Sequence, residues 1–324
     1  MNHIVFGATG FIGSHVAEAL AESGETITAI VRPGSNTDFL QQLGVKTRTL
    51  SAFSDDELCQ VLHEGDVIYN CIADVHLYKN LAQYNQTQVD VTKTLAEAAV
   101  QVGVERFIQL STVKVYGDTP EHFITEDQAF NPLFDFHQTM IDRETALKQI
   151  ASNSGLKIIL LQPAATLGRR SPVLKYFLEA HSHGSFPMIG NGQAKFSAID
   201  TRDIGRAMVF LAKADLSKEN IFLLKGYETS WQNLKEKLDE VRSITSKSKS
   251  LPKWAAKAMA SVWETLTPYG RQPFLTRFMV HDATQTLLVD DSRIRSLGFK
   301  PKHDIQDTLH YISKESTQMK IALG

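Results

Sequence analysis

The chain has 324 residues, of which 43% are hydrophobic, and a formal net charge of −2. This length suffices for one large core or two unequal lobes, and the near-neutral net charge gives no electrostatic sign of nucleic-acid binding. The two cysteines, Cys59 and Cys71, have neither a disulfide framework nor a metal-ligand spacing, so we expect packing roles and no metal site. The first apolar run is too short for a signal peptide, and no stretch has membrane-spanning length. We therefore expect a cytoplasmic protein.

Short β-branched segments alternate with helical patterns through the first half of the chain. The strand patterns are "HIVFGA", "TITAIV", "KTRTL", "DVIYNCIA", "RFIQLST" and "KIILLQP". The segments between them have apolar residues at helical spacing, and several end at a glycine suited to a helix C-cap. Apolar strands joined by helices of this length predict a parallel sheet covered on both faces. We predict an α/β fold with a doubly wound Rossmann sheet and a smaller, mostly helical C-terminal lobe.

A glycine-rich turn follows the first strand and opens the first helix in "IVFGATGFIGSHVAEAL". Gly7 permits a tight turn, Gly10 lets the backbone approach a pyrophosphate, and Gly13 lets the helix pack close to the strand. With a strand before it and a helix after it, this triplet predicts a dinucleotide site more strongly than a turn without ligand. The predicted cofactor-binding residues of the turn are Gly7, Thr9, Gly10, Phe11, Ile12 and Gly13.

The second strand ends in Arg32 and continues into "PGSN", where Ser35 and Asn36 offer further hydrogen bonds. An NAD site has an acidic residue at this place to bind the ribose 2′-hydroxyl, whereas arginine accommodates a 2′-phosphate. We therefore favour NADP(H) over NAD(H). The alternative is that Arg32 is a solvated residue at a strand end.

The strand and helix pattern weakens after Pro163, which suggests where the second lobe begins. We assign residues 1–165 to the dinucleotide-binding domain, with the strand–helix unit in 195–225 returning to it. Residues 166–194 and 226–324 make the smaller substrate lobe. Within it, 251–266 places eight apolar residues on one helical stripe, which favours packing into the lobe over a lid or a membrane-surface contact. These eight are Leu251, Trp254, Ala255, Ala258, Met259, Val262, Trp263 and Leu266.

The GxxGxxG spacing resembles the extended short-chain dehydrogenase/reductase superfamily, and the resemblance spans nearly the whole chain. "DVIYNCIAD" is similar to the fourth-strand motif, which implies that Ala73 lines the cofactor. "RFIQLSTVKVYGD" is similar to the strand that carries the catalytic Ser or Thr, which maps onto Thr112, four residues before Tyr116. "LLQPAATLG" implies that Pro163 borders the nicotinamide. "FSAIDTRDIGRAM", with Asp203 at the family's second Asp, and "SRIRSLGFKP" are similar to later family segments. The nearest branch is that of the NAD-dependent epimerases/dehydratases and 3β-hydroxysteroid dehydrogenase-like proteins.

In this superfamily proton transfer rests on Tyr-x-x-x-Lys, in which the Tyr phenol exchanges a proton with the substrate and the Lys lowers the phenol's pKa. Thr139 and Glu144 match the residues that flank the motif and fix the register. The Tyr position then falls on Phe136 and the Lys position on Met140, neither of which can donate a proton or carry a charge. No Tyr-x-x-x-Lys occurs between residues 117 and 150, so another register does not restore it.

Other departures from the family pattern are Ser51 at the adenine-contacting position, Asp90 on the long helix and Gln162 before the proline. His137 and Arg143 are the nearby candidates for a substitute acid and a substitute cation, against the alternative of ordinary surface or ion-paired helix residues. Thr112 is either a donor to a substrate carbonyl or an ordinary strand-end residue. Weaker candidates to face a substrate are His76, Tyr78, His181 and His183.

Three hypotheses remain open at this stage. The first is an NAD(P)-dependent oxidoreductase or epimerase with atypical or weak chemistry on the hydroxyl or ketone of a small apolar or sugar-like substrate. The second is a non-catalytic NADP(H)-binding sensor or partner protein, to which the loss of the Tyr and Lys points. The third is a different reaction in the same cleft with another acid. A homodimer is common in similar proteins.

Overall fold

The computed structural model describes residues 2–74, 79–118, 123–216, 220–268, 271 and 273–322. Its centre is a seven-stranded sheet in the order β11-β7-β5-β4-β1-β2-β3, and every neighbouring pair is parallel. The strands are β1 (His3–Phe6), β2 (Ile27–Val31), β3 (Lys46–Thr49), β4 (Val67–Asn70), β5 (Arg106–Leu110), β7 (Lys157–Pro163) and β11 (Ile221–Leu224). The first six are the six strands expected from the sequence, so the predicted Rossmann sheet is confirmed.

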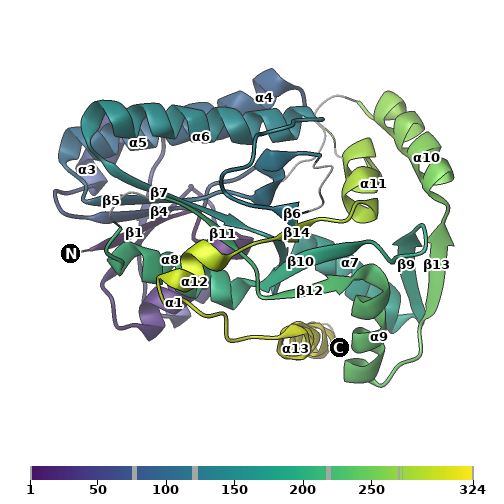
Figure 1. The fold of residues 1–324 in the computed structure, drawn as a ribbon. Coiled ribbons are helices and arrows are strands. Elements are labelled where there is room, and N and C mark those ends of the chain that lie inside the picture. Colours follow the sequence, from purple (N-terminus) through teal and green to yellow (C-terminus); the bar gives the residue numbers. More distant parts are fainter. Residues whose placement is uncertain are drawn as a thin grey trace.

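Helices cover both faces of this sheet (Figure 1). One face packs against α3 (Asp55–Val61), α5 (Val91–Val102) and α6 (Asp135–Ser154), and the other against α1 (Phe11–Glu22) and α8 (Thr201–Lys213). The two apolar layers explain why the strands read as continuous apolar runs. Helices α1 and α8 approach closely because Gly205 has no side chain, since a Cβ there would overlap the carbonyl of His15.

Shorter elements complete this part of the chain. These are α2 (Asp38–Gln42), α4 (Leu81–Asn85), a π-helical turn (Gln86–Asp90), a 3-10 turn (Val113–Tyr116) and α12 (Ser292–Ser296). The π-helical turn joins α4 to α5, and the 3-10 turn follows β5. Insertions of π geometry into helices are frequent at functional sites. Both turns lie next to the residues discussed below as the site.

The second lobe contains small sheets and helices beside the carboxyl ends of the central strands (Figure 1). A three-stranded sheet has the order β12-β10-β8, and two pairs, β13-β9 and β14-β6, are parallel. The strands are β6 (Phe123–Ile124), β8 (Ala165–Leu167), β9 (Ser185–Ile189), β10 (Lys195–Asp200), β12 (Tyr227–Ser230), β13 (Lys247–Leu251) and β14 (Leu288–Val289). The helices are α7 (Pro172–Ser182), α9 (Trp231–Arg242), α10 (Lys253–Leu266), α11 (Arg277–Thr284) and α13 (Ile305–Ala322).

The C-terminal segment is tied to the sheet domain by one buried carboxylate. Asp203 on α8 accepts hydrogen bonds from the backbone amides of Lys302 and His303 and from His303 Nδ1. Burial alone would raise the pKa of Asp203, but these donors outweigh it and hold that pKa below its usual value. The residue matched to the family's second Asp therefore has a structural role here, because it anchors the segment that leads into α13.

Helix α10 does not pack as the sequence suggested. Its buried positions are Ala256, Ala260 and Glu264, whereas Ala258 and five large apolar residues that were predicted to pack are exposed. The five are Trp254, Met259, Val262, Trp263 and Leu266. The prediction that this stripe packs into the lobe was wrong, because a narrow row of small alanines makes the contact instead. Among the described residues, no helix is both long and apolar enough to cross a bilayer.

Candidate functional site

The residues predicted to bind a cofactor gather at the carboxyl edge of the central sheet. The glycine turn follows β1, Arg32 follows β2, Ala73 follows β4, Thr112 follows β5, and Pro163 is the last residue of β7. In parallel sheets of this type, ligands bind outside the carboxyl ends of the strands. The fold therefore brings these segments, widely spaced in sequence, to a common edge, while their individual roles stay predictions.

The glycine turn has the steric features that a dinucleotide requires. Gly7 adopts a φ of +76°, and a Cβ there would lie 2.8 Å from the backbone of Cys71. A Cβ on Gly13 would overlap the carbonyl of Gly7, so the start of α1 can approach β1 only with glycine at this position. Gly10 is the N-cap of α1, and within the described chain no side chain caps that end and no acid lies in its first turn. The first amides of α1 are thus available to an anion, as a pyrophosphate needs.

The other predicted cofactor contacts differ in accessibility. Thr9, Gly10, Arg32 and Ala73 are exposed, whereas Pro163 is buried and pairs with Leu224 of β11. Phe11 and Ile12 are half-buried at the start of α1. Cys71 lies beneath the turn, and burial raises the pKa of its thiol to about 12. This agrees with the expected packing role, since such a thiol is not a thiolate near neutral pH.

Phe136 and Met140 are both packed against apolar side chains. The ring of Phe136 on α6 contacts the rings of Tyr84, at 5.9 Å between centroids, and Phe278 of α11, at 5.3 Å. Met140 is 2% exposed and lies in a cluster with Val113 and Tyr116 of the 3-10 turn. The two side chains that take the place of the family's Tyr and Lys are therefore part of the apolar packing between α6, the 3-10 turn and α11.

A buried hydrogen-bond network lies behind Thr112. Glu144 on α6 is fully buried and accepts hydrogen bonds from Ser111 Oγ and from Gln162 Nε2 of β7. Gln162 Oε1 in turn accepts from the Tyr116 hydroxyl at 2.9 Å. Burial raises the pKa of Tyr116, so this phenol stays protonated. The network joins β5, α6 and β7 and occupies Tyr116, which excludes it as a free proton donor in this arrangement.

Arg143 and His137 are neither surface nor ion-paired residues, which corrects the alternative reading of both. Arg143 is 2% exposed and donates to Gln88 Oε1 at 3.3 Å and to the Leu110 carbonyl at 3.2 Å. Burial lowers the pKa of Arg143 to about 10, with Glu144 opposing the shift. His137 is 1% exposed, and its Nδ1 lies 3.2 Å from the Leu133 amide, from which it accepts. Neither is an accessible substitute acid.

A lysine that sequence reasoning missed lies two residues after Thr112. The Lys114 ammonium pairs with the Asp282 carboxylate of α11, and the Lys114 amide donates to Thr112 Oγ1 at 3.3 Å. The Lys114 side chain is 17% exposed, which leaves it partly accessible. The signal in the sequence is a cation within "STVKVYG", but its partner is 168 residues further along the chain. Only the folded chain brings the pair together.

A second charged group, Asp74, lies after the end of β4 and is held by the π-helical turn. Asp74 directly follows Ala73, pairs with Lys79 and accepts a hydrogen bond from Thr87 Oγ1 at 3.1 Å. Gln88 of the same turn bonds the Asp74 carbonyl at 3.5 Å. This group also went unnoticed in the sequence. Of the weaker candidates, His181 bonds Asp239 inside the second lobe, His183 bonds the Glu179 carbonyl, and His76 and Tyr78 lie outside the described residues.

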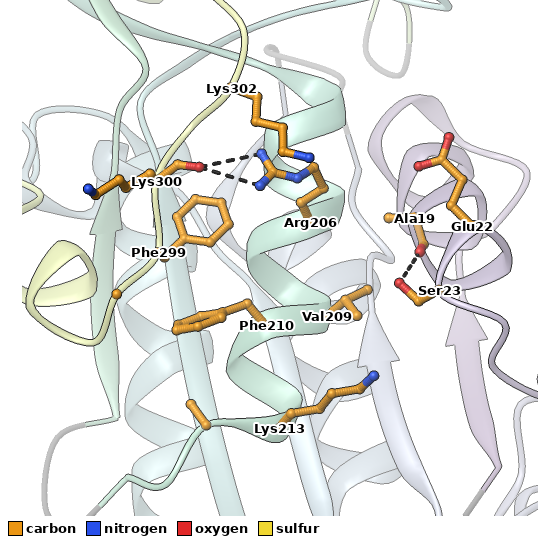
Figure 2. Close-up of a pocket in the computed structure, with 12 residues that line it drawn as sticks. Ala19, Glu22, Ser23, Arg206, Val209, Phe210, Lys213, Phe299, Lys300 and Lys302 are labelled. Atoms are coloured by element: carbon orange, nitrogen blue, oxygen red, sulfur yellow. Dashed lines mark hydrogen bonds between the residues drawn. The ribbon is translucent and has the colours of Figure 1, made fainter.

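A hollow of about 530 Å³ lies elsewhere, between α1, α8 and residues 298–302. Figure 2 shows Arg206 beside the Lys300 carbonyl, with Phe210 and Phe299 below. None of the predicted cofactor residues lines it. This hollow therefore does not belong to the candidate site. Across the part of the chain that is described, no group of three metal-ligating side chains comes together.

The parallel order of the sheet and the glycine turn at its carboxyl edge define a nucleotide-binding Rossmann protein of the extended short-chain dehydrogenase/reductase type. A profile of the NAD dependent epimerase/dehydratase family matches residues 3–223. The chain belongs to this family, which confirms the resemblance drawn from the sequence.

Individual relatives are distant but cover nearly the whole chain. A 4-hydroxy-2-methyl-3-oxo-4-farnesyl-3,4-dihydroquinoline-1-oxide ketoreductase of Stigmatella aurantiaca is 23% identical, with 92% of each chain covered. A UDP-glucose 4-epimerase of Vibrio cholerae is 24% identical, with 94% of this chain and 92% of the relative covered. The structure of UDP-glucuronic acid 4-epimerase from Bacillus cereus in complex with NAD has a TM-score of 0.78 at 19% identity. The match covers 98% of this chain and 97% of that chain.

The burial of His137 predicts a pH-dependent stability. Burial lowers the pKa of His137 from 6.5 to about 4. The unfolded chain therefore binds more protons between these values, and stability falls as the pH falls through that window. Between pH 7 and pH 5 we expect the wild-type protein to lose about 2 kcal/mol more of its unfolding free energy than His137→Gln. Urea unfolding at both pH values measures this, and an equal loss in the two proteins would contradict it.

Proposed function

We propose that the protein is an NADP(H)-dependent oxidoreductase that interconverts a hydroxyl and a ketone on an apolar substrate with an atypical proton-transfer group. The observation that supports it most is the glycine turn, in which Gly7 and Gly13 cannot carry a side chain and the start of α1 is open to a pyrophosphate. A bound nicotinamide dinucleotide supplies hydride transfer, and the residues of this chain supply binding, orientation and proton exchange.

Arg32 is the basis for the choice of NADP(H). It is exposed directly after β2, where the resemblance to Rossmann proteins places the adenosine ribose. The Bacillus cereus neighbour is in complex with NAD, so the comparison supports a nicotinamide cofactor. The preference for NADP(H) over NAD(H) therefore depends on Arg32 alone. A guanidinium matches a phosphate by paired, charge-assisted hydrogen bonds.

Thr112 and Lys114 are the side chains that we assign to the reacting oxygen. Thr112 is the second residue after the end of the central strand β5, and it is only partly buried. Lys114 is the partly accessible cation beside it, in a place where Phe136 and Met140 offer no charge. In this proposal Thr112 donates a hydrogen bond to the substrate oxygen, and the Lys114 ammonium stabilises negative charge on it and exchanges its proton.

Aromatic side chains next to these residues favour an apolar substrate. Phe134 and Phe136 contact Phe278, and His281 of α11 contacts Phe134 at 5.6 Å. Leu133, just before them, is half exposed. The Stigmatella aurantiaca relative is named for an apolar, farnesylated ketone, whereas the Vibrio cholerae relative is named for UDP-glucose. The aromatic lining supports the first of these chemistries.

A second candidate function is non-catalytic binding of the dinucleotide, as a sensor or as a partner protein. One observation favours it: Phe136 lies between the rings of Tyr84 and Phe278, so apolar packing takes the place of the family's phenol. Loss of general acid catalysis typically lowers the rate of a reaction by about 10²–10⁴-fold, which weakens the reaction without preventing it.

A cytoplasmic location and a homodimer are further parts of the proposal.

The cofactor preference is tested at Arg32. We expect Arg32→Ala to raise the Kd for NADPH by about tenfold or more, because a charged hydrogen bond is worth about 1.5–3 kcal/mol, while the Kd for NADH changes little. Fluorescence titration with both dinucleotides measures this. The matched control is Arg48→Ala, which removes another exposed arginine from the neighbouring strand β3. Equal weakening for NADPH and NADH, or no binding of either, would refute the preference.

The role of Lys114 is tested by Lys114→Met. We expect kcat for reduction of apolar ketones to fall about 10²–10⁴-fold, as for loss of a general acid, with the Kd for NADPH unchanged. Steady-state assays over a panel of ketones give the kcat values. Lys213→Met serves as control because it breaks a comparable pair with Glu25 at the end of α8. Unchanged turnover in Lys114→Met would remove this lysine from the mechanism.

Restoring the family's pair distinguishes the two candidate functions. Phe136→Tyr adds one hydroxyl at the family's Tyr position and, together with Met140→Lys, recreates Tyr-x-x-x-Lys. If the rest of the site is catalytic, we expect the double variant to raise kcat by about tenfold or more, although burying a lysine at Met140 costs stability. Phe136→Tyr alone is the control that leaves the apolar cluster intact. Tight NADPH binding without turnover in all three proteins would favour the non-catalytic function.

A further inference from the structure

Helix α10 lies at the edge of the second lobe (Figure 1). Its exposed side chains are mostly aromatic and aliphatic. Trp254 is 76% exposed and Leu266 is 72% exposed, at the two ends of the helix. We call the set Trp254, Met259, Val262, Trp263 and Leu266 the α10 face. Phe274, which is also exposed, extends it, with its ring 6.4 Å from that of Trp263. A contiguous exposed surface of this kind marks an interaction site, whereas single exposed apolar residues do not.

The segment that contains the α10 face is strongly basic in an otherwise acidic protein. Residues 245–280 contain six cationic residues and one acidic residue, a net charge of +5. Since the whole chain has a net charge of −2, the rest of the chain carries −7. The single acid, Glu264, is buried and accepts from Arg277 Nε at 2.6 Å, so it offsets the charge of Arg277 alone. The other exposed cations are Lys247, Lys249, Lys253, Lys257 and Arg271.

The polar and apolar residues of α10 occupy different sides. Successive helical residues are about 100° apart, which places Val262, Met259 and Leu266 at the centre of the exposed half of α10 and the two tryptophans at its opposite edges. Lys253 lies on the side of the buried residues, and Lys257 lies between that side and Trp254. A helix with aromatic and aliphatic residues on one side and lysines on its flank is suited to lie in a membrane interface, parallel to its plane. Tryptophan prefers that interface because its ring is apolar and its N–H is polar.

We propose that the α10 face docks the protein on a membrane surface that contains anionic lipids. Trp254, Trp263 and Leu266 enter the interfacial region, and the lysines of β13 and α10 lie at the level of the anionic headgroups. Each side chain contributes through a different force, because apolar burial acts on any bilayer and the lysines act only where the headgroups are negative. The proposal goes beyond the oxidoreductase function and does not depend on catalysis.

A second copy of the chain fits this surface less well. A symmetric dimer through the α10 face would bring two segments of net charge +5 together, and like charges at close range oppose association. An anionic bilayer has the opposite sign over its whole area. Charge complementarity therefore favours the membrane as the occupant.

Helix α11 connects the α10 face to the candidate site. Arg277 at its start bonds Glu264 of α10, and Phe278, the next residue, contacts Phe136. The docked surface is thus one helix away from the aromatic lining that we assign to the substrate. An apolar substrate dissolved in the bilayer would reach the site from the side of the molecule that faces the lipid.

Sedimentation with vesicles tests the proposal. The full-length protein is mixed with vesicles of phosphatidylcholine alone or of phosphatidylcholine with phosphatidylglycerol, and the bound fraction is measured. We expect binding to the anionic vesicles, weakening as salt is raised, and little binding to the zwitterionic ones. Two of the three tryptophans lie in the α10 face, whereas Trp231 stacks on Phe177 inside the lobe. The fluorescence should therefore shift to the blue when anionic vesicles are added.

Two pairs of variants separate the two forces. Trp254→Ser with Leu266→Ser should weaken binding by at least about tenfold. Lys253→Gln with Lys257→Gln should weaken it by about 30-fold, since each lysine near an anionic surface contributes about fivefold. The matched control, Lys46→Gln with Lys157→Gln, removes two exposed lysines of the central sheet and should bind as the wild-type protein does. Far-ultraviolet circular dichroism of each variant reports whether it is folded.

Several outcomes would overturn the proposal. These are an absence of vesicle binding, equal binding to both vesicle types, and unchanged binding by the folded α10 variants. A concentration-dependent dimer in sedimentation velocity that is abolished by Trp254→Ser with Leu266→Ser, without vesicle binding, would assign the face to a second copy. If the wild-type protein does not bind vesicles but binds an acidic protein, the α10 face would be assigned to a protein partner.

Discussion

A close backbone approach at the glycine turn sets the geometry of the rest of the site. Gly7 turns against the backbone of Cys71, and Gly13 lies against the carbonyl of Gly7, so β1, β4 and α1 meet with no room for a side chain. This contact fixes where α1 begins and directs its amides to the carboxyl edge of the sheet. Arg32, Ala73, Thr112 and Pro163 lie at that edge because parallel strands end there together. The site therefore depends on two features: the close contact at the glycine turn, and the parallel order that brings the strand ends together.

Much of the fold follows from local sequence patterns. The six predicted strands have runs of apolar residues because helices cover both of their faces, and the periodicity of those helices is equally plain. The glycine turn and the places of Arg32, Ala73, Thr112 and Pro163 follow from the same patterns and from the family motifs. Their positions depend on neighbouring residues in the chain, and such information is present in a short stretch of sequence.

Long-range contacts explain what the sequence did not reveal. In the sequence, Lys114 is an ordinary basic residue, and only the fold brings Asp282 of α11 to it. Arg143 is likewise typical of a surface residue in the sequence, but in the fold its guanidinium donates to Gln88 and to the Leu110 carbonyl. For α10 the error has a different origin. Hydrophobicity alone cannot tell a stripe that packs from a stripe that stays exposed, because Ala256 and Ala260 give a close helix contact with very little apolar area.

The position of α11 has a thermodynamic consequence. Its residues hold α10 on one side, through Arg277 and Glu264, and meet α6 on the other, through Phe278 and Phe136. If α11 has two positions that differ in how well α10 meets a surface, the same two positions differ in how tightly the aromatic lining holds a ligand. Linkage then requires reciprocity: whatever factor a surface contributes to ligand affinity, the ligand contributes equally to surface affinity. In the proposed function, a ligand bound beside Phe136 would then change the fraction of the protein that is bound to the surface.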